Sequence, residues 1–157
     1  MATIFVAGII QGSLRDRSIH KQCYRDRVVG LLRREFPEVE VYCPIETYPN
    51  SLEFSDEVAR RTFFGLMDRA GRADVLVAYV PEASMGTAIE MWQAHGQGRL
   101  VIAISPLAAN WAVRFLSHTV LPDIEAFERF VGSGEFAGLL EAQGIIAPPA
   151  RASQPHP

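Results

Sequence analysis

Several features are scarce in this sequence of 157 residues, and each scarcity narrows the class of protein. Cys23 and Cys43 are the only cysteines, too few for a disulfide framework and without metal-ligand spacing. No apolar run approaches the roughly 18–20 residues that a membrane span needs. The first ten residues lack the basic start and the cleavage pattern of a signal peptide. We therefore expect a cytoplasmic protein with free thiols and no association with a membrane.

Basic charge is also lacking, because the formal net charge is −3. A nucleic-acid-binding protein normally carries a basic face, so we expect no nucleic-acid polymer as a partner. The four histidines form no cluster in the sequence that would suggest a zinc site. The hydrophobic fraction of 48% and the charged fraction of 21% are ordinary for a globular domain.

Predicted strands and helices alternate along the chain. We expect strands at 3–10, 39–43, 75–80, 100–105 and 121–126, and helices at 18–36, 55–72, 87–95, 111–119 and 127–143, the last interrupted near 132–134. In the first helix the apolar residues share one face and the arginines lie opposite. This alternation predicts an α/β fold, a flavodoxin/Rossmann-like parallel sheet in the order 2-1-3-4-5 with helices on both faces. We expect one domain over 1–146 and a disordered tail over 147–157.

The most informative stretch runs from 74 to 91. Its first part, Val75–Val80, is an unbroken apolar run, typical of a central parallel strand buried on both faces, and Pro81 ends it. A short turn follows, and then a helix with Ala88, Met91, Trp92 and His95 on one face. The free N–H groups at the start of that helix would favour an anion.

Two side chains in this stretch each allow two interpretations. Glu90 is either a solvated glutamate favoured by the helix dipole or a carboxylate aimed into a cleft. Ser84 either caps the helix or binds an anion. Gly86 lies between them and would let the backbone approach a ligand closely.

The segment Ser84-Met85-Gly86-Thr87-Ala88-Ile89-Glu90 resembles the S/D-x-G-x-x-x-E motif of the nucleoside 2-deoxyribosyltransferase superfamily. The resemblance implies that Glu90 is the nucleophile that attacks the anomeric carbon of the sugar. Position 84 is usually aspartate in the base-exchanging transferases and serine in the nucleoside 5′-monophosphate N-glycosidases. Ser84 therefore favours the hydrolase branch, in which this serine contacts the 5′-phosphate and the backbone at Gly86 and Thr87 helps to hold it.

The resemblance implies further substrate-binding residues and an assembly. Gly8 lies near the end of the first strand, Gln11 and Gly12 lie in the loop after it, and Arg15 either faces a phosphate or belongs to a solvated charged turn. Ser117 and Asp123 follow the fourth strand, and Asn110 is a further polar candidate there, although a turn alone would also explain an asparagine. In the superfamily the later segment packs across a dimer and offers a polar residue to the neighbouring site. We therefore expect a homodimer or a higher homo-oligomer.

The sequence departs from the superfamily at two places. Ile9 and Gln11 stand where the hydrolases carry serine and arginine. Leu66 stands where an aspartate is expected eight residues before Asp74. The nearest acid is Asp68, which a turn of 3.6 residues places about 160° away from position 66. We retain Asp68 as a second candidate catalytic residue.

The function predicted is cleavage of the base–sugar bond of a nucleoside 5′-monophosphate through a covalent glycosyl-glutamate, with no metal or organic cofactor. Deoxyribosyl transfer between bases is the alternative enzyme, and a nucleotide-binding protein without turnover is an alternative from another class. Gly86, Thr87 and Glu90 also resemble the GGxGTxxE signature of the lysine-decarboxylase-like phosphoribohydrolases, but its first two glycines are absent.

Overall fold

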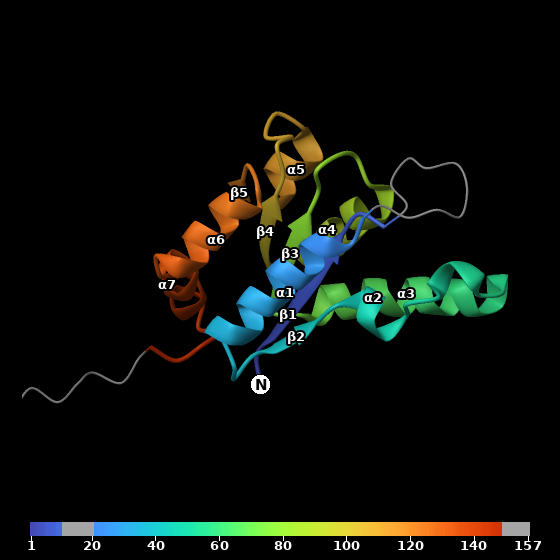
Figure 1. Ribbon diagram of the computed structural model, residues 1–157, viewed down its shortest axis with the longest axis horizontal. Helices are drawn as coiled ribbons and strands as arrows, with labels where there is room; N and C mark the ends of the chain where they lie inside the picture. The colour runs from blue at the N-terminus through green and yellow to red at the C-terminus, as the bar shows by residue number, and fades with distance from the viewer. Residues whose placement is uncertain (11–20, 149–157) are drawn as a thin grey trace, which may run out of the picture.

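The computed structural model describes residues 1–10 and 21–148, which form a five-stranded sheet with helices on both faces (Figure 1). The strand order is β2-β1-β3-β4-β5 and every neighbouring pair is parallel, so the predicted order 2-1-3-4-5 is confirmed. The strands are β1 (Thr3–Gly8), β2 (Glu40–Tyr42), β3 (Val75–Tyr79), β4 (Leu100–Ile104) and β5 (Thr119–Leu121).

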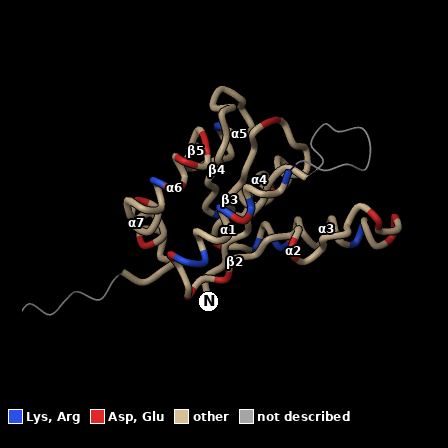
Figure 2. The backbone as a smooth tube through the Cα atoms, in the orientation of Figure 1, with Lys and Arg blue, Asp and Glu red and all other residues tan. Residues whose placement is uncertain are grey.

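The three central strands are apolar because helices cover both of their faces. Strands β1, β3 and β4 contain no charged residue, and the charges lie instead on the helices, the turns and the edge strand β2 (Figure 2). Almost every residue in these strands is buried. Unbroken apolar runs of this kind are expected of parallel strands buried on both faces.

Two helical layers enclose the sheet. One comprises α1 (Cys23–Glu35), α6 (Ile124–Gly132) and α7 (Glu135–Ala142), and its core includes Leu32, Phe127 and Phe136. The other comprises α3 (Asp56–Arg72), α4 (Met85–Gly96) and α5 (Trp111–Leu116), and its core includes Phe5, Leu76 and Met91. Short helices α2 (Pro44–Thr47) and η1 (Ser51–Glu53) connect β2 to α3. The first turns of α3 reach beyond the sheet at the carboxyl ends of the strands (Figure 1).

The register of the sheet brings the ends of its central strands level. Gly8 of β1 pairs with Tyr79 of β3, and Tyr79 pairs with Ile104 of β4. The turn between β3 and α4 therefore lies beside the end of β1. Ligands of open parallel sheets bind outside the carboxyl ends of the strands, so we expect a binding site at this edge.

The predicted strand at 121–126 is wrong. Strand β5 ends at Leu121, and α6 begins at Ile124. The side chain of Asp123 explains the difference, because its Oδ1 accepts a hydrogen bond of 2.7 Å from the N–H of Ala126 and so caps the helix. The interruption near 132–134 is confirmed, since Gly134 separates α6 from α7 with a left-handed φ of 84°.

Two further expectations differ from the structure. The stretch 44–54, expected to be a loop, contains α2 and η1, and Pro44 occupies the first turn of α2, where a proline is well tolerated. The buried face of the helix after β3 also differs from the predicted one. Trp92 is 66% exposed, whereas Thr87 and Glu90 are buried.

Among the described residues, none of the helices has the length and apolar character needed to cross a membrane. The tail expected over 147–157 falls, from 149 onward, outside the described residues, so both the tail and the domain boundary at 146 stay predictions.

Candidate active site

The β3–α4 turn places Glu90 at the carboxyl edge of the sheet. Ser84 has an extended backbone and caps α4, because its Oγ accepts a hydrogen bond of 3.4 Å from the N–H of Thr87. The hydroxyls of Ser84 and Thr87 also form a hydrogen bond of 2.9 Å. The cap fixes the first turn of α4, and Glu90 follows one turn later, on the face that packs toward the sheet.

Glu90 lies in a cleft of about 320 Å³ whose walls come from four segments. These are the end of β1, the η1 helix, the middle of α3 and the start of α4, and the lining residues are Gly8, Ile10, Ser51, Leu52, Phe63, Leu66, Met67, Ser84, Met85, Gly86, Thr87 and Glu90. Glu90 is the one ionisable side chain among these residues. The described part of the cleft therefore presents a single carboxyl group between mostly apolar walls.

The Glu90 carboxyl is buried, so the interpretation as a solvated glutamate is wrong. The residue is only 8% exposed. Burial penalises the charged form and raises the pKa of Glu90 to about 8, although the nearby positive charge of Arg25 acts in the opposite direction. The carboxyl is therefore mostly protonated at neutral pH in the free protein. Perturbed carboxyl groups in clefts are typical of sites that carry out chemistry.

Tyr24 of α1 packs directly behind the end of β1. Its hydroxyl donates a hydrogen bond of 3.3 Å to the carbonyl of Ile9, and the centroid of its ring lies 4.1 Å from the centroid of the Tyr79 ring. Burial raises the pKa of the Tyr24 phenol, with a smaller contribution from the charge of Glu90. A Cβ atom at Gly8 would overlap the Tyr24 hydroxyl. The glycine is thus required by this close approach.

We expect Gly8→Ala to destabilise the protein by about 1–3 kcal/mol, because the added methyl group must displace the buried Tyr24 ring or the strand itself. Gly86→Ala is the matched control, since no atom of the described residues beyond its own helical turn lies within 4 Å of a Cβ at that position. In the first turn of α4 this alanine should leave stability unchanged or raise it by up to about 1 kcal/mol. Urea unfolding of both variants measures the difference, and equal stabilities would contradict the steric account.

The structure brings five of the candidate residues into this cleft: Gly8, Ser84, Gly86, Thr87 and Glu90. The candidates Gln11, Gly12 and Arg15 lie outside the described residues. The others lie elsewhere. Asn110 caps α5 through Oδ1, which accepts hydrogen bonds from Ala112 and Val113, and it lines a smaller cavity of about 180 Å³ that shares Ser84 and Met85 with the cleft.

Three more candidates lie away from the cleft. Asp68 is exposed on α3, forms an ion pair of 3.0 Å with Arg72 and lines a separate hollow beside β2. Leu66, two residues before Asp68, does line the cleft of Glu90, so the two side chains point in different directions. Asp123 caps α6. Ser117 follows α5, and its buried Oγ has no hydrogen-bond partner among the described residues.

Side chains behind and opposite Glu90 come from other elements and are not expected from the sequence. The helical pattern places Arg25 among the solvent-facing arginines of the first helix, but it is buried, with an exposed fraction of 3%. Phe63 and Met67 line the cleft from α3, and Ser51 and Leu52 line it from a segment expected to be a loop. No local pattern in the sequence separates Arg25 from its solvent-facing neighbours.

Comparison with known proteins comes from structure alone. No known sequence family and no curated protein matches the chain. Among solved structures, a 2-deoxyribosyltransferase from Bacillus psychrosaccharolyticus aligns with a TM-score of 0.61 and 21% identity, over 81% of this chain and 90% of that one. A conserved protein from Enterococcus faecalis V583 aligns with a TM-score of 0.58 and 17% identity, over 85% and 98% of the two chains.

A CMP N-glycosidase from Clostridium botulinum aligns with a TM-score of 0.51 and 18% identity, over 86% of this chain and 98% of that one. Identities this low establish a shared fold, and the alignments span nearly the whole length of each neighbour. The resemblance inferred from the Ser84–Glu90 segment is thereby confirmed at the level of the fold. The chain has the fold of a 2-deoxyribosyltransferase and of a CMP N-glycosidase, the two kinds of enzyme that its central motif resembles.

Proposed function

We propose that the protein is an N-glycosidase that cleaves the base–sugar bond of a nucleoside 5′-monophosphate through a covalent intermediate on Glu90. The observation that carries the proposal is the buried carboxyl of Glu90, the one ionisable group among the described residues that line a cleft at the carboxyl edge of the sheet. The fold shared with a deoxyribosyltransferase and a CMP N-glycosidase supports it.

The chemistry requires a carboxylate beside the anomeric carbon. The ionised carboxylate of Glu90 attacks that carbon, and the base leaves with the electron pair of the glycosidic bond and takes a proton from water. The carboxylate also stabilises the positive charge that grows on the sugar. Water then attacks the same carbon, releases the Glu90 carboxylate and completes hydrolysis with net retention.

The start of α4 suits the 5′-phosphate. A helix N-terminus presents free N–H groups to an anion, and Gly86 leaves the space in front of them open. Ser84 brings a hydroxyl to the same turn, where an aspartate would repel a phosphate. We propose Gln11, Gly12 and Arg15 of the first loop, and Asn110, Ser117 and Asp123, as further substrate contacts on the strength of the sequence resemblance. Ser117 would act in the site of a neighbouring subunit.

Release of free base tests the proposal. The purified protein is incubated with ribo- and deoxyribonucleoside 5′-monophosphates and with the matching nucleosides, and the free base is measured by chromatography. We expect release from monophosphates only, and Ser84→Asp should weaken it by repelling the phosphate. Base exchange that requires a nucleoside and an acceptor base would identify a transferase instead. Thermal stabilisation by nucleotides without release would identify a binding protein.

We also propose that the protein is a homodimer or a larger homo-oligomer. Large apolar side chains lie exposed on the outer layer: Phe64 of α3, Met85, Ile89 and Trp92 of α4, and Trp111 and Phe115 of α5. Three of them follow helical spacing along α4, which packs between α3 and α5. A second copy of the chain would remove this apolar surface from water.

We expect sedimentation velocity to give at least a dimer at micromolar concentration, and Trp92→Glu to shift it toward the monomer, because a buried glutamate would lack a partner. Gln143→Glu makes a comparable change of charge at an exposed position after α7 and should leave the assembly intact. A monomeric wild type over the whole concentration range would contradict the proposal.

A further inference from the structure

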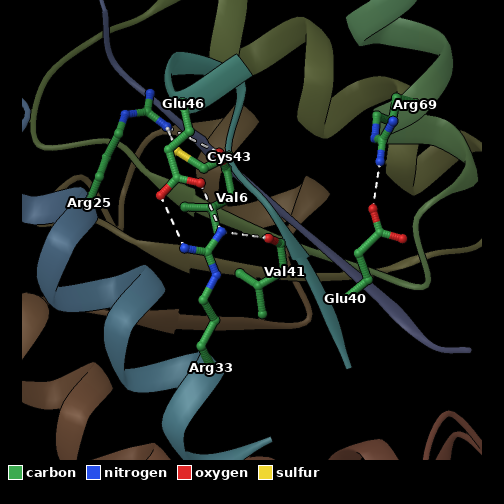
Figure 3. A network of polar contacts seen from close by, with 8 residues as sticks. All are labelled: Val6, Arg25, Arg33, Glu40, Val41, Cys43, Glu46 and Arg69. Atoms are coloured by element: carbon green, nitrogen blue, oxygen red, sulfur yellow. Dashed lines mark hydrogen bonds and ion pairs between the residues drawn. The ribbon is translucent and has the colours of Figure 1, made fainter. Parts of the chain in front are cut away.

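Arg25 is a buried cation whose hydrogen bonds all go to uncharged groups. It lies in the first turn of α1 and is 3% exposed. Its Nε donates to Gln22 Oε1 at 2.6 Å and its Nη2 to the carbonyl of Gly8 at 3.1 Å. Its Nη1 donates to the carbonyl of Val6 at 3.2 Å and to Cys43 Sγ at 3.5 Å, as Figure 3 shows.

The described residues offer no carboxylate within ion-pair distance of this guanidinium. Two other arginines drawn in Figure 3 behave differently: Arg33 pairs with Glu46 at 2.8 Å, and Arg69 pairs with Glu40 at 2.6 Å. Removing a charged group from water is costly, and it is usually offset by an opposite charge nearby. Hydrogen bonds to these uncharged acceptors hold the guanidinium of Arg25 in place but do not balance its charge.

The acidic group that interacts electrostatically with Arg25 is the carboxyl of Glu90. Gly8 joins the two residues, because its carbonyl accepts from Arg25 and its backbone lines the cleft that contains Glu90. The positive charge of Arg25 lowers the pKa of Glu90, against the larger effect of burial.

Among the described residues, the other titratable group that interacts electrostatically with Glu90 is Tyr24, which lies on the same helix as Arg25. From α3, the cleft is faced by Phe63, Leu66 and Met67, which carry no charge. From η1 it is faced by Ser51 and Leu52. Within the described part of the chain, burial and the one cation Arg25 are therefore the main influences on the ionisation of Glu90.

We propose that Arg25 is a positioning residue that favours the ionised, attacking form of Glu90 and fixes the end of β1 beside it. The inference rests on the proposed function for the statement that Glu90 attacks the sugar. A bound sugar excludes water from the cleft, which strengthens the attraction between the two charges. A purely structural role, in which Arg25 only ties the carbonyls of Val6 and Gly8 to α1, would leave the ionisation of Glu90 unaffected by the charge at position 25.

The test measures the ionisation of Glu90 directly. The protein is labelled with ¹³C at the glutamate carboxyl carbons, and the Glu90 resonance is assigned by its loss in Glu90→Gln. Its titration midpoint is then compared in the wild type, Arg25→Gln and Arg25→Lys. We expect the neutral glutamine to raise the midpoint by about one pH unit or more, and the charged lysine to keep it within about half a unit of the wild type. The pH at which base release is half-maximal should move in the same way.

An unchanged midpoint in a folded Arg25→Gln would overturn the proposal. If only Arg25→Lys folds, its titration midpoint is the test. Because lysine keeps the positive charge, a midpoint about one pH unit or more above that of the wild type would overturn the proposal as well. The NMR titration does not depend on turnover, so the proposed function and the proposed role of Arg25 can be contradicted independently. A wild type that releases no base contradicts the proposed function while the titration still tests Arg25, and base release with unmoved titrations contradicts the role of Arg25 alone.

Discussion

Glu90→Gln should lower the rate of base release by at least about 10³-fold while the protein stays folded, because no nucleophile remains to attack the anomeric carbon. The glutamine has the shape of the protonated glutamate, which is the form that the buried site favours. Steady-state release of base from the best monophosphate measures the loss, and circular dichroism confirms the fold. A variant that keeps more than about a tenth of the wild-type rate would exclude Glu90 as the nucleophile.

Two further variants test whether the loss of activity is specific to Glu90. Glu38→Gln makes the same chemical change at an exposed position in the turn between α1 and β2, and it should leave base release unaltered. Asp68→Asn tests the other acid that the sequence singled out. Asp68 faces solvent beside Arg72 and does not line the cleft, so we expect less than about a threefold change in rate. A loss as large as that of Glu90→Gln would require α3 to turn when substrate binds.

The course of the sheet could be predicted from the sequence because its central strands are simple. Runs such as Val75–Val80 are apolar at every position, which is the pattern of a strand covered on both faces. The edge of the sheet was harder to predict. Strand β5 has three residues of intermediate exposure, and the cap that begins α6 at Asp123 decided where the chain changes from strand to helix.

The motif residues of the site were predictable because they are close together in sequence. Ser84, Gly86 and Glu90 lie within two turns of one helix, so their spacing alone brings them to one edge. The remainder comes from other elements. Phe63 and Met67 reach the cleft only because α3 packs against α4, and Arg25 reaches the end of β1 only through the angle of α1 across the sheet. Its charge resembled that of solvent-facing neighbours such as Arg27, and no local pattern distinguished it.

The ionisation of Glu90 should also appear in the stability of the protein. Its ordinary pKa is 4.5, which applies to the unfolded chain, and burial raises the value in the folded protein to about 8. Between these two values the folded protein retains a proton that the unfolded chain has released. Stability from this group is therefore fully present below pH 4.5 and is lost as the pH rises toward 8, by about 1.4 kcal/mol per pH unit.

Glu90→Gln removes that proton linkage, so the two proteins should differ in a way that depends on pH. We expect the free energy of unfolding of the wild type, measured in urea from pH 5 to 9, to fall relative to that of the variant until about pH 8 and then to run parallel to it. The same ionisation should raise kcat/KM for base release as the pH increases toward 8, because only the carboxylate attacks. Parallel stability curves over the whole range would mean that Glu90 ionises normally in the folded protein. A lower pH for half-maximal kcat than for half-maximal kcat/KM would instead locate a difference in the bound state, where the sugar's developing positive charge favours the carboxylate.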